Sequence, residues 1–448
     1  MTYPDFTGKT ITAAILGGQI PAAVHLEADR FKEVTGLQVD AAELPFADLY
    51  PRIMTELRAG TGGFDIVSVP QFYVGDMVSF LDPLDSYMQQ YPFDAYEDIL
   101  PSYRNLAVLN GKTYCITMDG DVWTLYYRLS AFADPKNQSD FKAKYGRDLA
   151  VPTTWDEYNQ VAQFFTGGGK YGTAMMLAPV FAGNEFAQRF YSYGGKWFDA
   201  ETMNAKVNTP AGVSAFQSII ETVKASPPGV LNYGQTEQND DFAQGRIPML
   251  IDWGDTGGHT GDPARAAKEV VGDVGYAPVP GAMLNGQLNR PQLLAWGFCL
   301  AVAKDSQNKD AAYQYIRFFT SREQGAAEVD LHKGLDPYRE SYFASQGAQT
   351  QFPNSDKWLA QTLENQKNGV PDLRIPGAKQ YYNLIAVGIG TALANNQNNL
   401  DAIDAQAVMD GIAKEMDRLT DDLGRDQQRQ AYEGIMLADP SYSGMPDE

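Results

Sequence analysis

Residues 10–69 read TITAAILGGQIPAAVHLEADRFKEVTGLQVDAAELPFADLYPRIMTELRAGTGGFDIVSV. Three apolar runs of strand length stand in this stretch, at 10–16, 37–44 and 64–69. The two segments between them, 21–35 and 46–59, carry apolar side chains at helical spacing, and glycines follow each one. This alternation of strands and helices predicts a parallel sheet with crossover helices.

The carboxyl ends of these predicted strands are followed by polar and aromatic side chains. They are Gln19 after the first strand, Glu43 at the end of the second, and Gln71 with Phe72 after the third. In parallel sheets, ligands bind beyond this edge. We therefore expect these four residues to contact a ligand.

The chain has 448 residues, which is enough for two or three domains. It carries 35 basic and 56 acidic residues, a net charge of −21, which disfavours nucleic acid and anionic lipid as partners. No apolar run approaches the roughly 20 residues of a membrane span. Residues 1–5 lack the basic region and apolar core of a signal peptide, so composition alone does not assign a compartment.

Cysteine and histidine are rare in this chain. Cys115 and Cys299 each lie in an apolar, strand-like run, and we expect two buried free thiols, with a disulfide as the alternative. The three histidines are scattered, so we expect no metal site. Phosphate-binding glycine loops and the common nucleophile motifs are absent from the sequence, so we expect neither a cofactor nor a catalytic residue.

Asp119 and Asp121 lie between two strand-like segments, within residues 114–127. On an extended segment, residues i and i+2 point the same way. Two carboxylates on one face favour hydrogen bonds from sugar hydroxyls. Glycoside hydrolysis and a solvated turn are the alternatives.

Four tryptophans stand close to Gly, Asp or Lys at predicted loop ends: Trp123, Trp197, Trp253 and Trp296. The apolar face of a sugar ring stacks on aromatic side chains, while its hydroxyls need polar partners. Core packing is the alternative for any one of them. As a set they favour a carbohydrate site.

An ordered series of motifs runs along nearly the whole chain. It comprises FDIV at 64–67, LDPLD at 81–85, GKTY at 111–114, LYYR at 125–128, PTTWDEY at 152–158, GGKW at 194–197, FAQGRIPM at 242–249, PVPG at 278–281 and NKDAAYQYIRFFT at 308–320. In this order the series resembles the family 1 extracellular solute-binding proteins of bacterial ABC importers, the group that includes maltose-binding protein.

The resemblance implies a type II periplasmic-binding-protein fold, with two α/β lobes around a ligand cleft and a mixed sheet flanked by helices in each lobe. It places the N-terminal lobe at 1–118 and 297–343 and the C-terminal lobe at 119–296 and 344–448. The hinge is expected near 118–122, 292–298 and 336–346. The family is exported, and since no lipid-anchoring cysteine stands near residue 1, we expect a free periplasmic protein.

The resemblance also implies roles for individual residues. Asp119 and Asp121 match acidic ligand contacts at the first crossing between lobes, and Trp296 with Gly297 matches the second crossing. Gln19, Glu43 and Gln71 match strand ends, Trp253 follows the FAQGRIPM motif, and Arg374 matches a late ligand contact. Arg374 would receive an acidic group on the sugar or, alternatively, form a structural ion pair.

Together these features predict a monomeric, non-enzymatic importer component that captures a carbohydrate and delivers it to membrane permease subunits. A binding protein for a polyol or osmolyte is the first alternative. A polysaccharide-acting enzyme that uses Asp119 and Asp121 is the second.

Overall fold

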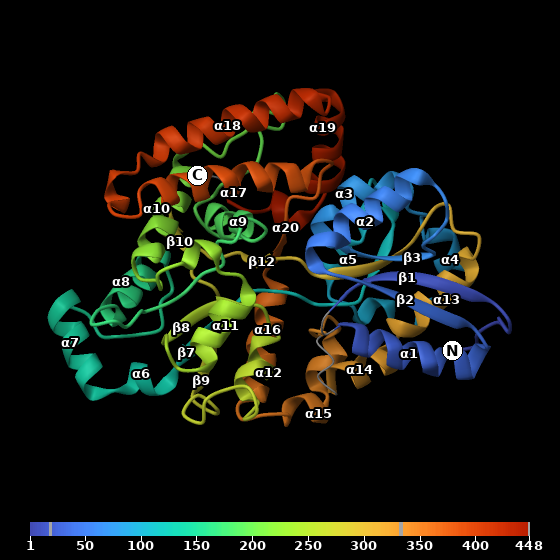
Figure 1. The fold of residues 1–448 in the computed structure, drawn as a ribbon, viewed down its shortest axis with the longest axis horizontal. Coiled ribbons are helices and arrows are strands. Elements are labelled where there is room, and N and C mark those ends of the chain that lie inside the picture. The colour runs from blue at the N-terminus through green and yellow to red at the C-terminus, as the bar shows by residue number, and fades with distance from the viewer. Residues whose placement is uncertain (18–19, 331–334, 447–448) are drawn as a thin grey trace.

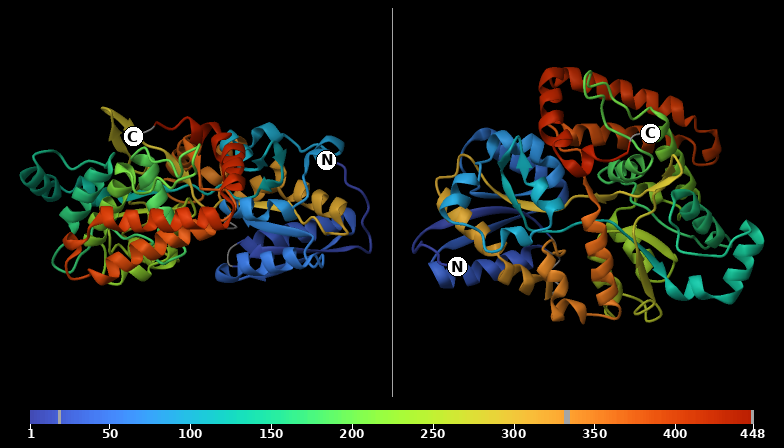
Figure 2. Two further views of the ribbon diagram at one scale, coloured as in Figure 1. Left: turned by 90° about the horizontal axis from the view of Figure 1, so that it is seen from above. Right: turned by 180° about the vertical axis from the view of Figure 1, so that it is seen from behind.

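The computed structural model describes residues 1–17, 20–330 and 335–446. These residues form two lobes joined by extended chain segments (Figure 1), with the N-terminus on one lobe and the C-terminus on the other (Figure 2). The first lobe is built on a five-stranded sheet of order β2-β1-β3-β13-β6. The second is built on a three-stranded sheet of order β8-β7-β9.

The segment quoted first folds as its pattern predicts. Its elements are β1 (Thr10–Leu16), α1 (Ile20–Thr35), β2 (Gln38–Leu44), α2 (Phe46–Ala59) and β3 (Ile66–Pro70). β1 pairs in parallel with both β2 and β3, so the predicted parallel sheet with crossover helices is confirmed. Later strands make the whole sheet mixed, because β13 (Phe298–Val302) runs antiparallel to β3 and to β6 (Cys115–Thr117).

Short helices and a hairpin complete the first lobe. They are α3 (Val74–Met77), α4 (Asp85–Gln90), α5 (Pro101–Leu106), β4 (Val108–Leu109), β5 (Lys112–Thr113), α13 (Lys309–Phe319) and α14 (Arg322–Asp330). α15 (Gln346–Gln349) follows in the chain, before the last part of the second lobe begins.

The second lobe is richer in helix. Its first part contains β7 (Thr124–Arg128), α6 (Leu129–Ala133), α7 (Pro135–Tyr145), α8 (Trp155–Phe165), α9 (Ala182–Ser192), α10 (Pro210–Lys224), α11 (Gln235–Ala243), β8 (Met249–Asp252), α12 (Thr256–Gly261), β9 (Val274–Ala277), β10 (Ala282–Leu284), β11 (Gln287–Asn289) and β12 (Gln292–Leu294). Its last part contains α16 (Ser355–Lys367), β14 (Gly369–Pro371), α17 (Ala378–Asn395), α18 (Ala405–Asp422), α19 (Arg425–Ala431) and α20 (Pro440–Ser443). The sheet strands β7, β8 and β9 are antiparallel, whereas β12 and β14 form a separate parallel pair.

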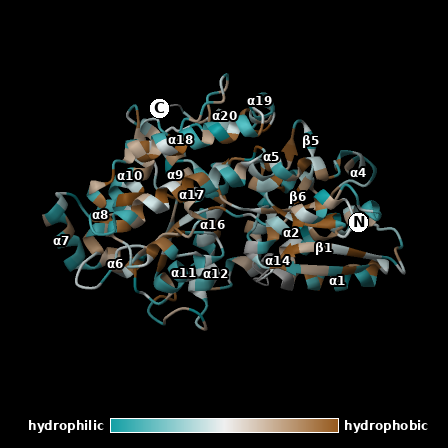
Figure 3. Ribbon diagram, turned by 45° about the horizontal axis from the view of Figure 1, so that its top comes forward, coloured by the Kyte–Doolittle hydropathy of each residue, from teal (hydrophilic) through white to brown (hydrophobic). Residues whose placement is uncertain are grey.

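A local signal in the sequence explains where helix α8 begins. α8 begins at a capping box in which Thr154 accepts from the backbone of Glu157 and the Glu157 carboxylate accepts from the backbone N–H of Thr154. Helix α7 is largely hydrophilic (Figure 3) and buries Phe141.

None of the described helices combines the length and apolarity that a membrane crossing requires.

Cys115 and Cys299 form a disulfide, with their Cα atoms 5.6 Å apart. β6 and β13 are neighbouring strands in which Cys299 opposes Thr117 and Ala301 opposes Cys115, so the two cysteines are diagonal neighbours. The prediction of two free thiols is therefore wrong. The sequence around each cysteine does not reveal the bond, because the two cysteines are 184 residues apart and meet only when their strands pair.

Candidate functional site

Two chain crossings meet between the sheets of the two lobes. Residues 118–123 connect β6 to β7, and residues 295–297 connect β12 to β13. The backbone N–H groups of Met118 and Asp119 donate to the carbonyl of Phe298, at 2.9 and 3.2 Å. A side-chain carboxylate oxygen of Asp121 accepts from the N–H of Gly297 at 3.1 Å. The crossings are thus bonded to each other as one unit.

A third segment, which contains Asp336, packs onto the first crossing. The N–H of Asp336 donates to Oδ1 of Asp119 at 2.7 Å, and the N–H of Gly120 donates to the carbonyl of Asp336 at 3.0 Å. A Cβ on Gly120 would lie 2.3 Å from the carbonyl oxygen of Pro337, so only glycine fits this contact. The amide of Gln366 on α16 donates to the carbonyls of both Gly120 and Pro337.

Four carboxyl groups gather at this junction: Asp119, Asp121, Asp255 and Asp336. Asp255 follows Gly254, where a Cβ would lie 2.4 Å from Oδ2 of Asp336. Burial raises the pKa of Asp119 to about 7 and that of Asp255 to about 6. Burial, and next to it the neighbouring Asp119 carboxylate, raise the pKa values of Asp121 and Asp336 well above their ordinary range.

Trp296 occupies the second crossing in a left-handed conformation, with φ of 74°. A bulky residue with positive φ is strained, so surrounding contacts must hold it. Its indole N–H donates to Asn184 at 3.3 Å and its backbone N–H donates to Asp372 at 3.3 Å. The rings of Phe72 and Phe181 lie 4.6 and 6.0 Å from its ring.

Gln71 and Phe72 approach the crossing from the end of β3. The N–H of Gln71 donates to the carbonyls of Trp296 and Gly297, at 3.1 and 3.0 Å. Its side chain is only 2% exposed, and its amide forms no hydrogen bond with any described residue. The amide nitrogen lies 3.0 Å from the position that a Cβ on Gly297 would take. A buried amide without partners is costly, so it is suited to receive a ligand.

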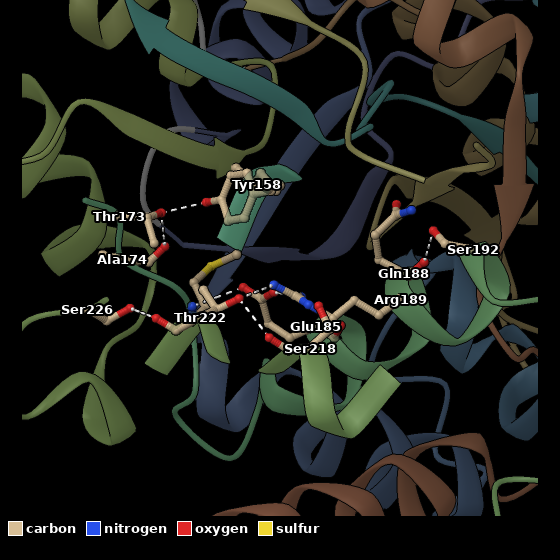
Figure 4. Close-up of polar contacts among 12 residues, drawn as sticks. Tyr158, Thr173, Ala174, Glu185, Gln188, Arg189, Ser192, Ser218, Thr222 and Ser226 are labelled. Carbon is tan, nitrogen blue, oxygen red and sulfur yellow. Dashed lines mark hydrogen bonds and ion pairs between the residues drawn. The ribbon is translucent and has the colours of Figure 1, made fainter. Parts of the chain in front are cut away.

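Helix α9 contacts the strand that leads into the second crossing. Glu185 and Arg189 form a buried ion pair within this helix, at 2.7 Å, and Gln188 lies on the same helix (Figure 4). Glu185 also accepts from the N–H of Met176, and Arg189 donates to the hydroxyl of Thr222. The amide of Gln188 accepts from the N–H of Leu293 and donates to the carbonyl of Pro291. It therefore sets the register of β12, which leads directly into Trp296.

Two further predicted tryptophans lie on the second-lobe side. The indole N–H of Trp253 donates to the carbonyl of Ala295 at 2.9 Å, and its ring lies 5.8 Å from that of Phe181. Trp123 is fully buried and packs edge to face against Trp253 at 5.8 Å. Trp253 therefore lies beside the second crossing, and Trp123 packs against the ring of Trp253.

Two predicted residues, Glu43 and Trp197, lie apart from this junction. Glu43 is the penultimate residue of the edge strand β2, three strands from β13, where its half-exposed carboxylate contacts His25 at 2.7 Å. Trp197 is fully buried in helix packing, and its indole N–H donates to Tyr191. Gln19 lies outside the described residues.

Arg374 is a structural residue in this fold. Its guanidinium is 1% exposed, forms an ion pair with Asp439 at 3.0 Å and donates to the carbonyls of Leu106 and Ile435. The guanidinium therefore forms the structural ion pair that was the alternative expectation, while its Nε has no hydrogen-bond partner among the described residues.

Sequence reasoning missed Asp255, Asp336 and Asp372. Asp255 stands two residues after Trp253, and Asp336 lies in the predicted hinge at 336–346, so both stood close to residues already selected. The carboxylate of Asp372 accepts from Tyr382, Asn184 and Trp296, and burial raises its pKa to about 6. No local pattern in the sequence marks that role.

Several binding proteins are similar in sequence to large parts of this chain. A probable amino-acid ABC transporter periplasmic-binding protein of Sinorhizobium fredii is 26% identical over 327 residues, which cover 70% of each chain. The maltotriose-binding protein of Pyrococcus abyssi is 22% identical over 296 residues, which cover 65% of this chain and 58% of that protein. The mannitol-binding protein of Pseudomonas aeruginosa is 22% identical over 310 residues, which cover 66% of this chain and 67% of that protein.

Solved structures show the same fold. An ABC transporter solute-binding protein of Agrobacterium radiobacter in complex with ribitol superposes with a TM-score of 0.76 and 21% identity, over 93% of this chain and all of that one. A maltose-bound T. maritima protein gives a TM-score of 0.75 at 21% identity, over 92% of this chain and all of that one. The predicted two-lobed fold is thereby confirmed. The sequence model of the bacterial extracellular solute-binding protein family matches residues 17–326, and the chain is a member of that family.

Proposed function

We propose that the chain is the substrate-binding component of a bacterial ABC importer, which captures a carbohydrate or polyol between its lobes and delivers it to membrane permease subunits. The observation that supports this most is the convergence of Gln71, Asp121 and Trp296 at Gly297. These residues come from the strand end of one lobe and from both crossings.

The side chains at the junction suit a polyhydroxylated ligand. Carboxylates accept hydrogen bonds from hydroxyls, the Gln71 amide both donates and accepts, and the ring faces of Trp296 and Phe72 provide apolar contact. A ligand that touches both lobes favours the closed arrangement by its differential affinity for it. The permease subunits then recognise the closed form.

The names of relatives bear on the ligand class. Those compared above bind maltotriose, mannitol, ribitol or maltose, and one carries an amino-acid name. Sugars and linear polyols present the same hydroxyl pattern to carboxylates and amides, so both belong in the proposal. The family is one of transport proteins, and we propose that Asp119 and Asp121 bind rather than catalyse.

The predicted lobe boundaries, 1–118 with 297–343 and 119–296 with 344–448, stay part of this proposal, as do the three hinge positions. So do the monomeric state and the free periplasmic location. Light scattering after gel filtration measures whether the protein is a monomer. Fractionation of cells that express the full-length protein measures whether it is periplasmic.

A thermal-shift screen over mono-, di- and oligosaccharides and polyols tests the function. We expect at least one compound to raise the melting temperature in a concentration-dependent way, with one site by calorimetry. Chromatography of the same compound after overnight incubation should recover it unchanged. Cleaved product would indicate an enzyme, and the absence of any shift across the panel would contradict the proposal.

A further inference from the structure

The carboxyl groups at the junction outnumber what a neutral sugar needs. Asp119, Asp121, Asp255 and Asp336 come from three separate chain segments that are bonded or packed against one another. Within the described residues, no Lys, Arg or His forms an ion pair with any of the four. Arg265 has a Coulombic effect on Asp255, but its guanidinium lies against Asp262 at 3.8 Å.

Packing carboxylates together without a cation costs free energy, because burial removes water and like charges repel. Hydroxyl groups satisfy carboxylate oxygens but leave this repulsion in place. A bound ammonium group removes both costs, since it donates N–H bonds and supplies a positive charge. The net charge of −21 for the whole chain also attracts cations to the site.

A second, independent feature at the same place points to hydroxyls. The Gln71 amide is buried, has no hydrogen-bond partner among the described residues, and lies beside Gly297, whose N–H is held by Asp121. An amide recognises a neutral group that both donates and accepts, which is what a hydroxyl does. The aromatic rings of Trp296, Phe72 and Phe181 next to it suit both a sugar face and a cation.

We propose that the ligand of this junction is a polyhydroxylated amine, an amino sugar or an amino polyol, whose protonated nitrogen lies among Asp119, Asp121, Asp255 and Asp336 while Gln71 binds a hydroxyl. This inference rests on the proposed function and narrows its ligand class. A quaternary ammonium compound fits less well, because it has no N–H to donate to the carboxylate oxygens.

Calorimetry with matched ligand pairs tests this inference on the full chain. The pairs are glucosamine with N-acetylglucosamine, chitosan disaccharide with its N-acetylated form, and 1-amino-1-deoxysorbitol with sorbitol, and choline serves as the quaternary ammonium probe. We expect the amine of at least one pair to bind at least about tenfold more tightly than its neutral partner, as is typical of hydrogen bonds to charged groups. We also expect Asp255→Asn to reduce that preference by about tenfold.

Two controls separate the site from general charge effects. Asp426→Asn on α19 removes the same charge at a side chain that is 84% exposed, and it should leave the preference unchanged. Binding of the amine should also release protons, measured in buffers of different ionisation enthalpy, because the ammonium stabilises ionised carboxylates. The neutral partner should release fewer.

The outcomes distinguish this inference from the function on which it rests. Equal or tighter binding of the neutral partners would overturn the amine and leave a carbohydrate-binding protein. Tighter binding of choline than of any polyhydroxylated amine would overturn it as well. If neither the neutral compounds nor the amines bind, the proposed function fails together with the inference.

Discussion

The disulfide between Cys115 and Cys299 closes a loop of 184 residues, and its removal is the most direct test of the first lobe's architecture. Both side chains are 1% exposed, so alanine is the appropriate replacement because it buries no new polar group. In the loop-entropy description, a crosslink over a loop this long restricts the unfolded chain by about 5 kcal/mol at room temperature. Measured losses for native disulfides are typically about 2–5 kcal/mol.

We therefore expect the double variant Cys115→Ala/Cys299→Ala to lose about 2–5 kcal/mol of unfolding free energy. The assay is urea unfolding followed by tryptophan fluorescence and by circular dichroism, with and without reductant. Reduced wild-type protein should approach the double variant, whereas the variant itself should not respond to reductant. Each single variant should resemble the double variant, since each loses the same bond.

Two results would refute this reasoning. One is a wild-type midpoint equal to that of the double variant in the absence of reductant. The other is the titration of two free thiols in unreduced, denatured wild-type protein. The first would show that the crosslink does not stabilise the fold. The second would show that β6 and β13 are not linked, and would restore the interpretation as two buried thiols.

Other perturbations distinguish structural residues from the proposed ligand contacts. Arg374→Met should cost about 3–5 kcal/mol in urea unfolding without changing ligand affinity, because it strands a buried charge, whereas the exposed Arg429→Met should cost less than about 1 kcal/mol. Because the pKa of Asp119 is raised to about 7, folding favours its protonated form, and the stability this contributes below about pH 4 is lost as the pH rises through about 7. Asp119→Asn should therefore gain up to about 4 kcal/mol relative to wild type between pH 4 and pH 8 in the ligand-free protein, and equal pH profiles would contradict the assignment. Trp296→Phe should weaken ligand binding in calorimetry, whereas Trp197→Phe should lower only the melting temperature.

The local sequence pattern predicts where strands and helices lie, but it does not predict which strands pair. The strand at 298–302 is visible in the sequence as an apolar run after Gly297, but nothing near it indicates that it lies between β3 and β6. Its neighbours are selected by packing between segments far apart in the chain. The same limit explains the wrong expectation for Cys115 and Cys299.

The candidate site also combines residues that local pattern reveals with residues that only long-range contacts bring there. Asp119 and Asp121 were selected because spacing and turn chemistry are local properties. Asp336 joins them through a bond between residues 217 positions apart, which no local pattern reveals. Trp197 and Trp296 each stand within two residues of a glycine, and only their packing distinguishes a core side chain from one at the crossing.

The position of β13 has a consequence for the order in which the chain can fold. β6 pairs only with β13 among the described strands, and β13 stands between β3 and β6. A nascent chain that ends before residue 298 therefore has β1, β2 and β3 but an open edge where β13 belongs, and exposed edges of this kind promote aggregation. Completion of the first lobe must wait for synthesis of most of the second, so a fragment comprising residues 1–118 should not reach the native sheet by itself.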